Sequence, residues 1–387
     1  MTVQIAVGLS TLADPLESGS EAGASAAQGL GDGQADLALV FLAGRPLAAP
    51  EAALEGVHEA LGPETLVGCG AGGVLAGGRE LEQGTATAVW AAALDGGTVQ
   101  PFHASLTDEE ASAAIEGMPE LGEARAAIML ADPYSFPTDA LLSRLAVDSP
   151  GVPILGGLAS GRTADGSAAL LFGEEVHNEG AVGVLLEDVE LLPCVSQGAA
   201  PLGPEVTITA AEGNVIHELA GRPALATVER IIAGLPASER ALVAGGLLLG
   251  IVVERNKADY EQGDFLVRGI AGADPDSGAL VVGALVDEGQ VVRLHARNAR
   301  SADEDLRRQL RVRREALAGA APAGSIVFSC NGRGAAMFGA GDHDAVAVAE
   351  ELGGAPAAGF FAAGEIGPVG GRSFLHGFTA TIGVLPE

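Results

Sequence analysis

The chain has 387 residues, of which 51 are acidic and 21 basic, so its formal net charge is −30. This length suggests two or three domains, and an apolar content of 48% with only three cysteines excludes a disordered chain and a disulfide-stapled fold. Such an acidic protein repels phosphate backbones, so we expect no nucleic-acid partner.

The apolar residues are spread through the chain rather than gathered into a membrane span. The longest apolar stretch, residues 241–253, is interrupted by glycines and is shorter than the ~20 residues that a spanning helix needs. The N-terminal sequence lacks the basic region of a signal peptide, and three unpaired cysteines suit a reducing compartment. We therefore expect a cytoplasmic protein without membrane insertion.

A glycine-alanine pattern, G-x-x-A-x-G, occurs three times, which indicates an internal repeat. Each copy ends a short apolar run, and after a polar loop each is followed by a glycine that opens a β-rich run. The copies occupy residues 68–73, 156–161 and 359–364.

Each copy is preceded by an apolar run, a loop and a helix-like stretch. The apolar runs are 37–43, 126–131 and 325–329, and the helix-like stretches are 50–61, 138–146 and 343–352. This order predicts three β-α-β units in mixed or mainly parallel sheets, because short continuous apolar strands suit a sheet buried on both faces. The fold class is therefore α/β.

The segments outside these units are less regular. Residues 1–30 predict a short strand followed by a loop or weak helix. The later segments predict helices at 214–219, 224–235 and 302–318 and strands at 246–254, 264–270, 279–285 and 291–295. Two units lie before a boundary near residue 220 and one lies after it, so the expected domains are 1–220 and 221–387. A layered α-β-β-α sandwich is one way in which the two expected domains can pack together.

A ligand site is expected at the carboxyl ends of the parallel strands, where ligands of open α/β folds bind. The loops predicted to meet there are 132–135 and 330–334, together with the three glycine loops. The glycines allow a ligand to approach the backbone, or they allow tight packing between strand and helix. The sequence leaves both interpretations open.

Two arginines are candidates for holding an anion. Arg333 lies in a glycine-flanked loop, where its guanidinium suits a carboxylate or phosphate, although an ion pair with an acidic side chain fits equally well. Arg268 lies within an apolar strand, so it either anchors an anion or pairs with an acid. Glu365, in the third glycine loop, hydrogen-bonds an amine or caps neighbouring amides.

Cysteine and histidine chemistry is weakly indicated. Cys330 is a nucleophile candidate with His376 or His343 as its base, but a small buried side chain is the favoured interpretation. His376 is a candidate for ligand contact or haem coordination, with a structural role favoured. The cysteines are too far apart for a zinc site and the histidines show no paired spacing, so no metal is expected.

Three C-terminal motifs, at residues 328–334, 359–368 and 375–379, resemble the FIST C-terminal domain. Residues 264–270 also match the beginning of its C-terminal part. Residues 66–75 and 153–186 resemble the FIST N-terminal domain. The resemblance extends from about residue 30 to the end. It implies that 1–220 is the FIST N-like domain and 221–387 the FIST C-like domain.

The resemblance implies a bacterial sensory or signal-transduction module that binds small ligands such as amino acids. No fused output domain is visible, so the signal is expected to pass to a separate signalling protein. The alternatives are a haem-dependent nitric-oxide sensor, a protein-interaction adaptor and a cysteine-dependent enzyme; no catalytic mechanism comes with the resemblance. The predicted ligand-binding residues are Arg268, Asn331, Arg333, Gly334, Gly364, Glu365 and His376.

Overall fold

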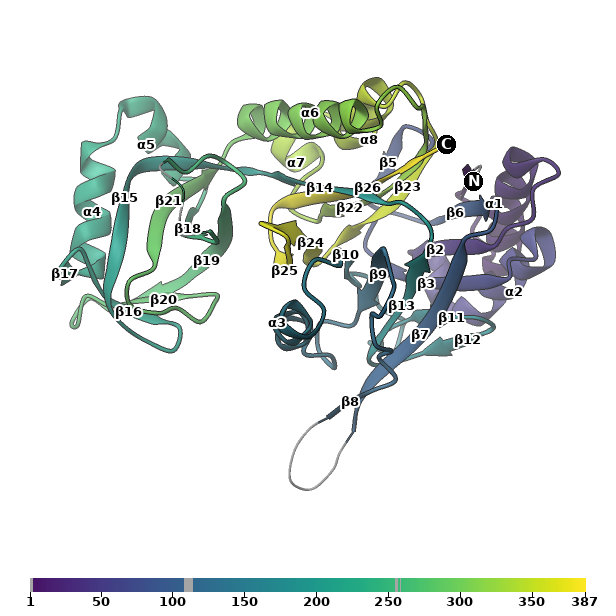
Figure 1. Cartoon of the computed structure of the whole chain (residues 1–387), viewed down its shortest axis with the longest axis horizontal. Coiled ribbons are helices and arrows are strands. Elements are labelled where there is room, and N and C mark those ends of the chain that lie inside the picture. The colour runs from purple at the N-terminus through teal and green to yellow at the C-terminus, as the bar shows by residue number, and fades with distance from the viewer. Residues whose placement is uncertain (1–2, 108–113, 255–256, 258) are drawn as a thin grey trace. The chain divides into compact units, whose positions relative to one another are not determined.

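The computed structural model describes residues 3–107, 114–254, 257 and 259–387 (Figure 1). It is a mixed α/β protein with parallel strand pairs, which confirms the predicted fold class. The chain forms two compact units: residues 1–195, 306–375 and 380–387 make the first, and residues 196–305 and 376–379 make the second. The sequence boundary near residue 220 falls inside the second unit.

The first unit contains three parallel strand pairs, each joined by a helix. In the first pair, α2 (Pro50–Leu61) joins β2 (Leu37–Ala43) to β3 (Thr65–Ala71). In the second, α3 (Thr138–Asp148) joins β9 (Ala126–Ala131) to β10 (Ile154–Leu158). In the third, α8 (His343–Glu351) lies between β22 (Pro322–Cys330) and β23 (Ala357–Ala362). An antiparallel strand pairs with the first strand of each: β6 (Ala86–Leu94), β13 (Ala181–Glu187) and β26 (Thr379–Pro386).

A hairpin follows each parallel pair but joins a different sheet. The hairpin of β4 (Val74–Ala76) and β5 (Arg79–Leu81) follows β3 and pairs with β23. That of β11 (Leu170–Phe172) and β12 (Glu175–His177) follows β10 and pairs with β3. That of β24 (Glu365–Val369) and β25 (Arg372–His376) follows β23 and pairs with β10. The three sheets are thus linked in a ring.

The outer strands complete three sheets with the same order. They are β1 (Val3–Ser10) beside β6, β7 (Thr98–Thr107) with β8 (Ala114–Glu116) beside β13, and β14 (Leu192–Gln197) beside β26. The short helices are η1 (Arg45–Ala48) and α7 (Ala335–Phe338), and α6 (Ala299–Ala316) leads from the second unit into the first. No described helix is long and apolar enough to cross a bilayer.

The N-terminal segment is better ordered than its composition predicts. Residues 1–30 were expected to hold a loop or weak helix, yet α1 (Pro15–Leu30) is a regular helix. Its amide at Glu17 is capped by the Asp14 side chain at 3.0 Å, and Gly31 ends it. Its small residues allow close packing: a Cβ on Gly19 would lie 2.0 Å from the Ala53 carbonyl of α2. Tertiary packing therefore outweighs weak helix propensity here.

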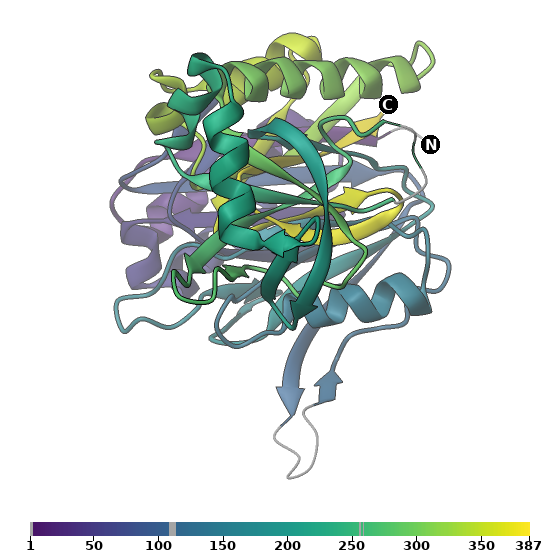
Figure 2. The same cartoon turned by 90° about the vertical axis from the view of Figure 1, so that its left-hand side faces the viewer.

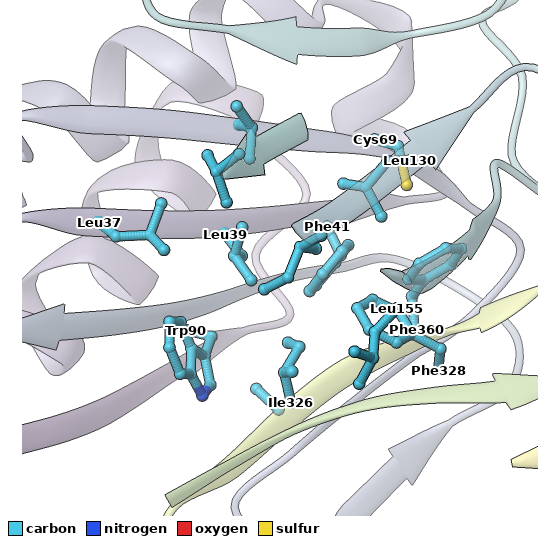
Figure 3. Packing of buried hydrophobic residues seen from close by; sticks show 14 of the residues in the cluster. Leu37, Leu39, Phe41, Cys69, Trp90, Leu130, Leu155, Ile326, Phe328 and Phe360 are labelled. Atoms are coloured by element: carbon cyan, nitrogen blue, oxygen red, sulfur yellow. The ribbon is translucent and has the colours of Figure 1, made fainter. Parts of the chain in front are cut away.

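The core of the first unit lies among the three sheets (Figure 3). The rings of Phe41 and Phe360, from β2 and β23, stack with centroids 4.9 Å apart, and Phe328 meets Phe360 edge-on. Trp90 is also buried, and its Nε1 donates to the Ser325 carbonyl at 3.0 Å. Strands of different sheets are therefore held together by aromatic packing and one satisfied polar contact.

The first glycine of each G-x-x-A-x-G copy has a packing role. Gly68 lies opposite Val40 in the parallel register, Gly156 opposite Met129 and Gly359 opposite Val327. A Cβ at these glycines would lie 2.1, 1.8 and 1.7 Å from the carbonyl oxygen of the opposite residue. No side chain fits at such distances, so close strand contact explains these three glycines.

The second unit is a closed antiparallel sheet with two helices, α4 (Ala224–Gly234) and α5 (Ala237–Val243); Figure 2 views it from its own side. Pairings run β15–β21–β18–β19–β20–β16 and return from β16 to β15. The strands are β15 (Ala199–Glu212), β16 (Val215–Leu219), β18 (Leu247–Val252), β19 (Phe265–Ala273), β20 (Leu280–Val282) and β21 (Val291–Arg297), with β17 (Arg222–Pro223) beside β16.

The helix expected at residues 214–219 is wrong, because this segment is strand β16. It forms a hairpin with β15 through a turn in which Gly213 has a positive φ of 60°. The Gly213–Asn214 dipeptide is a turn signal that favours a hairpin. The helix expected at 224–235 and the four strands expected from residue 246 onwards are present with adjusted bounds.

Candidate functional site

A buried ion pair lies where β22 ends in the first unit. The loop after β22 places Arg333, and the first turn of α8 places Asp344. Nε and Nη2 of Arg333 donate to the two carboxylate oxygens of Asp344 at 2.7 and 2.8 Å. The exposed fractions of the two side chains are 0% and 1%. Two parallel charge-assisted hydrogen bonds fix the guanidinium plane.

Asp344 is further stabilised as a carboxylate by two neighbours. It accepts hydrogen bonds from Oγ of Ser329 at 2.8 Å and from Nδ1 of His343 at 2.9 Å. Burial alone would raise the pKa of Asp344, but the charge of Arg333 and these hydrogen bonds hold it well below its usual range. The site therefore contains a permanently ionised carboxylate.

The other end of the guanidinium is less satisfied. Nη1 of Arg333 is buried and has no hydrogen-bond partner among the residues that the structure describes. Burial lowers the pKa of Arg333, but the charge of Asp344, its hydrogen bonds and smaller contributions from Cys330 and Glu365 together outweigh this effect and raise the pKa. Glu365 is fully buried, so two buried acidic side chains lie within electrostatic range of one guanidinium.

An aromatic ring covers this cluster. Phe338, at the end of α7, stacks on His343 with the ring centroids 3.4 Å apart. Its centroid also lies 5.2 Å from Cζ of Arg333. The half-buried Phe338 ring therefore packs on the imidazole of His343 and lies within cation–π range of the Arg333 guanidinium.

The hairpin of β4 and β5 brings two more carboxylates to the same loops. Oε1 of Glu80 accepts from the backbone amide of Ala345 in the first turn of α8 at 3.0 Å, and burial raises the pKa of Glu80. Oε1 of Glu82 accepts from the backbone amide of Ala335 at 2.8 Å. Gly334 has a φ of 81°, and a Cβ there would lie 2.5 Å from Oε2 of Glu82. Glu82 thus covers the Gly334 backbone.

The glycine loops of the first unit meet one another beside this cluster. Oγ of Ser160 accepts from the amide of Gly72 at 2.8 Å and donates to the carbonyl of Phe361. The amide of Asn331 donates to the carbonyl of Ala362 at 2.9 Å, and that of Leu158 to Gly364 at 2.8 Å. The loops after β3, β10 and β23 therefore form one connected edge.

A second charged group occupies the predicted loop after β9. Asp132 accepts from the amide and the hydroxyl of Ser135 at 2.9 and 2.7 Å and pairs with Arg162. Cζ of Arg162 lies 4.4 Å from the ring centroid of Tyr134. The Asp132 carboxylate is therefore already used by this loop.

Of the predicted site residues, five lie in the first unit: Asn331, Arg333, Gly334, Gly364 and Glu365. Arg268, on β19, and His376, at the end of β25, belong to the second unit. Cys330 is 8% exposed, and its Sγ accepts from the amide of Gly332 at 3.4 Å.

The sequence did not identify Asp344, Glu80 or Glu82. An acidic residue in the first turn of the helix that follows an arginine loop was an available signal for Asp344. Glu80 and Glu82 carried no such signal, because their hairpin joins a sheet distant in sequence. No group of three or more histidine, cysteine or acidic side chains suited to a metal ion occurs among the described residues.

Residues 36–222 match the FIST N domain and residues 224–368 match the FIST C domain. The whole chain is also similar to proteins described as uncharacterized. A Mycobacterium tuberculosis H37Rv protein is 41% identical over 386 residues, which cover 100% of both chains. A Mycobacterium bovis protein is 40% identical over 387 residues, covering 100% of this chain and 99% of the relative.

Proposed function

The chain belongs to the FIST family, whose domains are associated with sensory signal transduction, and we propose that it is a sensor for a free amino acid or another small anion. The observation that carries this proposal is Nη1 of Arg333, a buried donor that no described residue uses, at the carboxyl ends of parallel strands. Ligands of open α/β folds bind at this edge, and a guanidinium N–H suits a carboxylate oxygen.

The buried carboxyl group of Glu365 favours an amino acid over a simple anion. Asp344 already pairs with one side of Arg333, and Glu365 lies within electrostatic range of the same guanidinium. In this proposal a ligand ammonium group pairs with Glu365, while the ligand carboxylate takes the free N–H of Arg333. In this proposal Asn331 contacts the polar groups of the ligand.

Glu82 suggests how the ligand is coupled to a signal. Its carboxylate holds the Ala335 amide, which is the kind of contact that a ligand carboxylate makes. In this proposal the ligand replaces Glu82 and releases the end of the hairpin of β4 and β5. That hairpin pairs with β23, so its movement is passed into the sheet and on to a separate signalling protein.

A thermal-shift screen of the full chain with free amino acids, small carboxylates and haemin tests the proposal. A ligand at 100 times its Kd adds ~2.7 kcal/mol to the free energy of unfolding. We expect one amino acid to raise the melting temperature, and its N-acetylated form to raise it much less. Arg333→Lys removes the free N–H and should abolish the shift, whereas Arg45→Gln, an exposed arginine of the same unit, should retain it.

Because Arg333 also holds Asp344, each variant is first checked for cooperative unfolding without ligand. Glu365→Gln provides a second test, and we expect it to weaken the amino acid more than its N-acetylated form. The proposal is wrong when no amino acid or small carboxylate shifts the melting temperature, or when a folded Arg333→Lys protein responds fully. A shift with haemin alone, with a Soret band, would favour the haem-sensor alternative instead.

A further inference from the structure

The second unit contains a cavity of about 530 Å³ between β15 and the end of α4. A bulge in β15 creates the space. The pairing with β21 is regular up to Leu202 opposite Leu294 and resumes at Val206 opposite Val292, so residues 203–205 face Arg293 alone. Bulges of this kind redirect side chains and are frequent beside binding sites.

One wall of the cavity is apolar and closely fitted. Gly203, in the bulge, has a φ of 59°, and a Cβ there would lie 2.7 Å from Cγ2 of Ile231 on α4. Leu235, just after α4, is next to the same position, with its Cδ2 at 3.2 Å. A ligand body beside this wall contacts aliphatic side chains.

Arg293 supplies an unused donor beside this wall. Its Nε is buried and has no hydrogen-bond partner within the part of the chain that the structure describes. Its Nη1 lies 3.6 Å from Oε1 of Glu205, which is too long for a hydrogen bond. A buried guanidinium N–H without an acceptor is costly, so a ligand that provides an acceptor is stabilised here.

Two arginines line the cavity. Arg230 and Arg293 stand against one carboxylate of the lining, Glu239, and Glu205 in the bulge lies 3.6 Å from Arg293. Arg230 is exposed and forms no ion pair with any described residue. In a chain with a formal charge of −30, this cavity is lined by two guanidinium groups. They favour an anion at this position.

We propose that this cavity is a second ligand site, and that it binds a small amphipathic carboxylate. Nε of Arg293 donates to the carboxylate, Arg230 adds electrostatic attraction, and Ile231 and Leu235 pack against the apolar body. The apolar wall and the acidic side chain of Glu239 disfavour a strongly charged phosphate. This site is independent of the Arg333 cluster, because all of its residues belong to the second unit.

Isothermal titration of the full chain with octanoate tests the proposal, with octanamide as the neutral match and acetate as the anion without an apolar body. We expect octanoate to bind at least about tenfold more tightly than either, which corresponds to ~1.4 kcal/mol. Arg293→Gln should lose this preference for the charged form. Arg222→Gln, an exposed arginine of the same unit, is the matched control and should leave binding unchanged.

Gly234→Leu provides a test that leaves Arg293 in place. Gly234 lines the cavity, and a Cβ there meets no atom within 4 Å, so a side chain at this position starts in open space beside the cavity. We expect this variant to unfold like the parent protein and to lose octanoate binding. Equal binding of octanamide, unchanged binding by a folded Arg293→Gln variant, or no octanoate binding at millimolar concentration would overturn the proposal.

Discussion

Arg333 and Asp344 form a two-point ion pair, at 2.7 and 2.8 Å, from which water is excluded. Removing one charge leaves the other buried and unpaired, which typically costs 3–5 kcal/mol. We therefore expect Asp344→Asn to lower the free energy of unfolding by about 3–5 kcal/mol, measured by urea denaturation. Ser329→Ala removes one hydrogen bond to the same carboxylate and should cost only about 1–2 kcal/mol. Equal stability of Asp344→Asn and the parent would contradict this account.

His295 makes the second unit sensitive to mild acid. Its Nδ1 donates to the Arg293 carbonyl at 3.0 Å, and burial lowers the pKa of its side chain to about 4. Because the unfolded histidine has a pKa of about 6.5, it binds a proton more readily than the folded one. The buried, neutral His295 therefore contributes fully to the free energy of unfolding above about pH 6.5. This contribution falls by roughly 3 kcal/mol as the pH falls towards 4.

His295→Phe keeps an aromatic ring in this position and removes the titrating group. We expect its free energy of unfolding to depend less on pH between 7 and 4 than that of the parent. Denaturant titrations at several pH values measure both slopes. Identical slopes would show that another group is responsible.

The strand-facing glycines predict a sharp stability difference between similar substitutions. Gly359→Ala would place a Cβ 1.7 Å from the Val327 carbonyl oxygen, so the parallel pair must separate. Overpacking in a core typically costs about 1–3 kcal/mol, and a backbone clash belongs at the upper end. Gly341→Ala is the control, because a Cβ there meets nothing within 4 Å. Thermal unfolding should separate the two variants, and equal melting temperatures would refute the packing role.

Cysteine alkylation tests the enzyme alternative. Cys69, Cys194 and Cys330 are all buried, and burial strongly raises the pKa of Cys69. Thiols react as thiolates and need access to reagent. We expect iodoacetamide to label the native protein far more slowly than the urea-unfolded protein, with mass spectrometry assigning each site. Rapid labelling of native Cys330 at neutral pH would instead support a reactive thiol.

Much of the α/β organisation could be predicted because it depends on local patterns. The apolar runs, the helices between them and the glycine that ends each unit all lie within short windows of sequence. The sequence could not predict that each hairpin joins a different sheet from the parallel pair that it follows. The three-residue strands β4 and β11 show the same pattern whichever sheet they join. Strand β16 was not predicted, because its short segment is compatible with a helix and only the preceding glycine turn indicates a hairpin.

The candidate site was predictable to a similar extent. The loop of Arg333 was identified from its glycines, but its partner was not, since any of 51 acidic residues fitted. Which of them is buried depends on where α8 packs, and residue type does not encode this. Glu82 reaches the loop through a pairing between Val74 and Phe360, positions near opposite ends of the chain.

That pairing also constrains the order of events during synthesis. The hairpin of β4 and β5 leaves the ribosome early, but β23, the strand that it joins, is made near the end of the chain. Residues 196–305, which form most of the second unit, are made in between. The first unit therefore keeps an unpaired edge until residues 196–305 have been made and β23 follows, so the pairing of β4 with β23 is a long-range closure of the kind that folds slowly. Until β23 is made, the edge of β4 that pairs with it has no strand partner, and an unpaired strand edge is a template for aggregation.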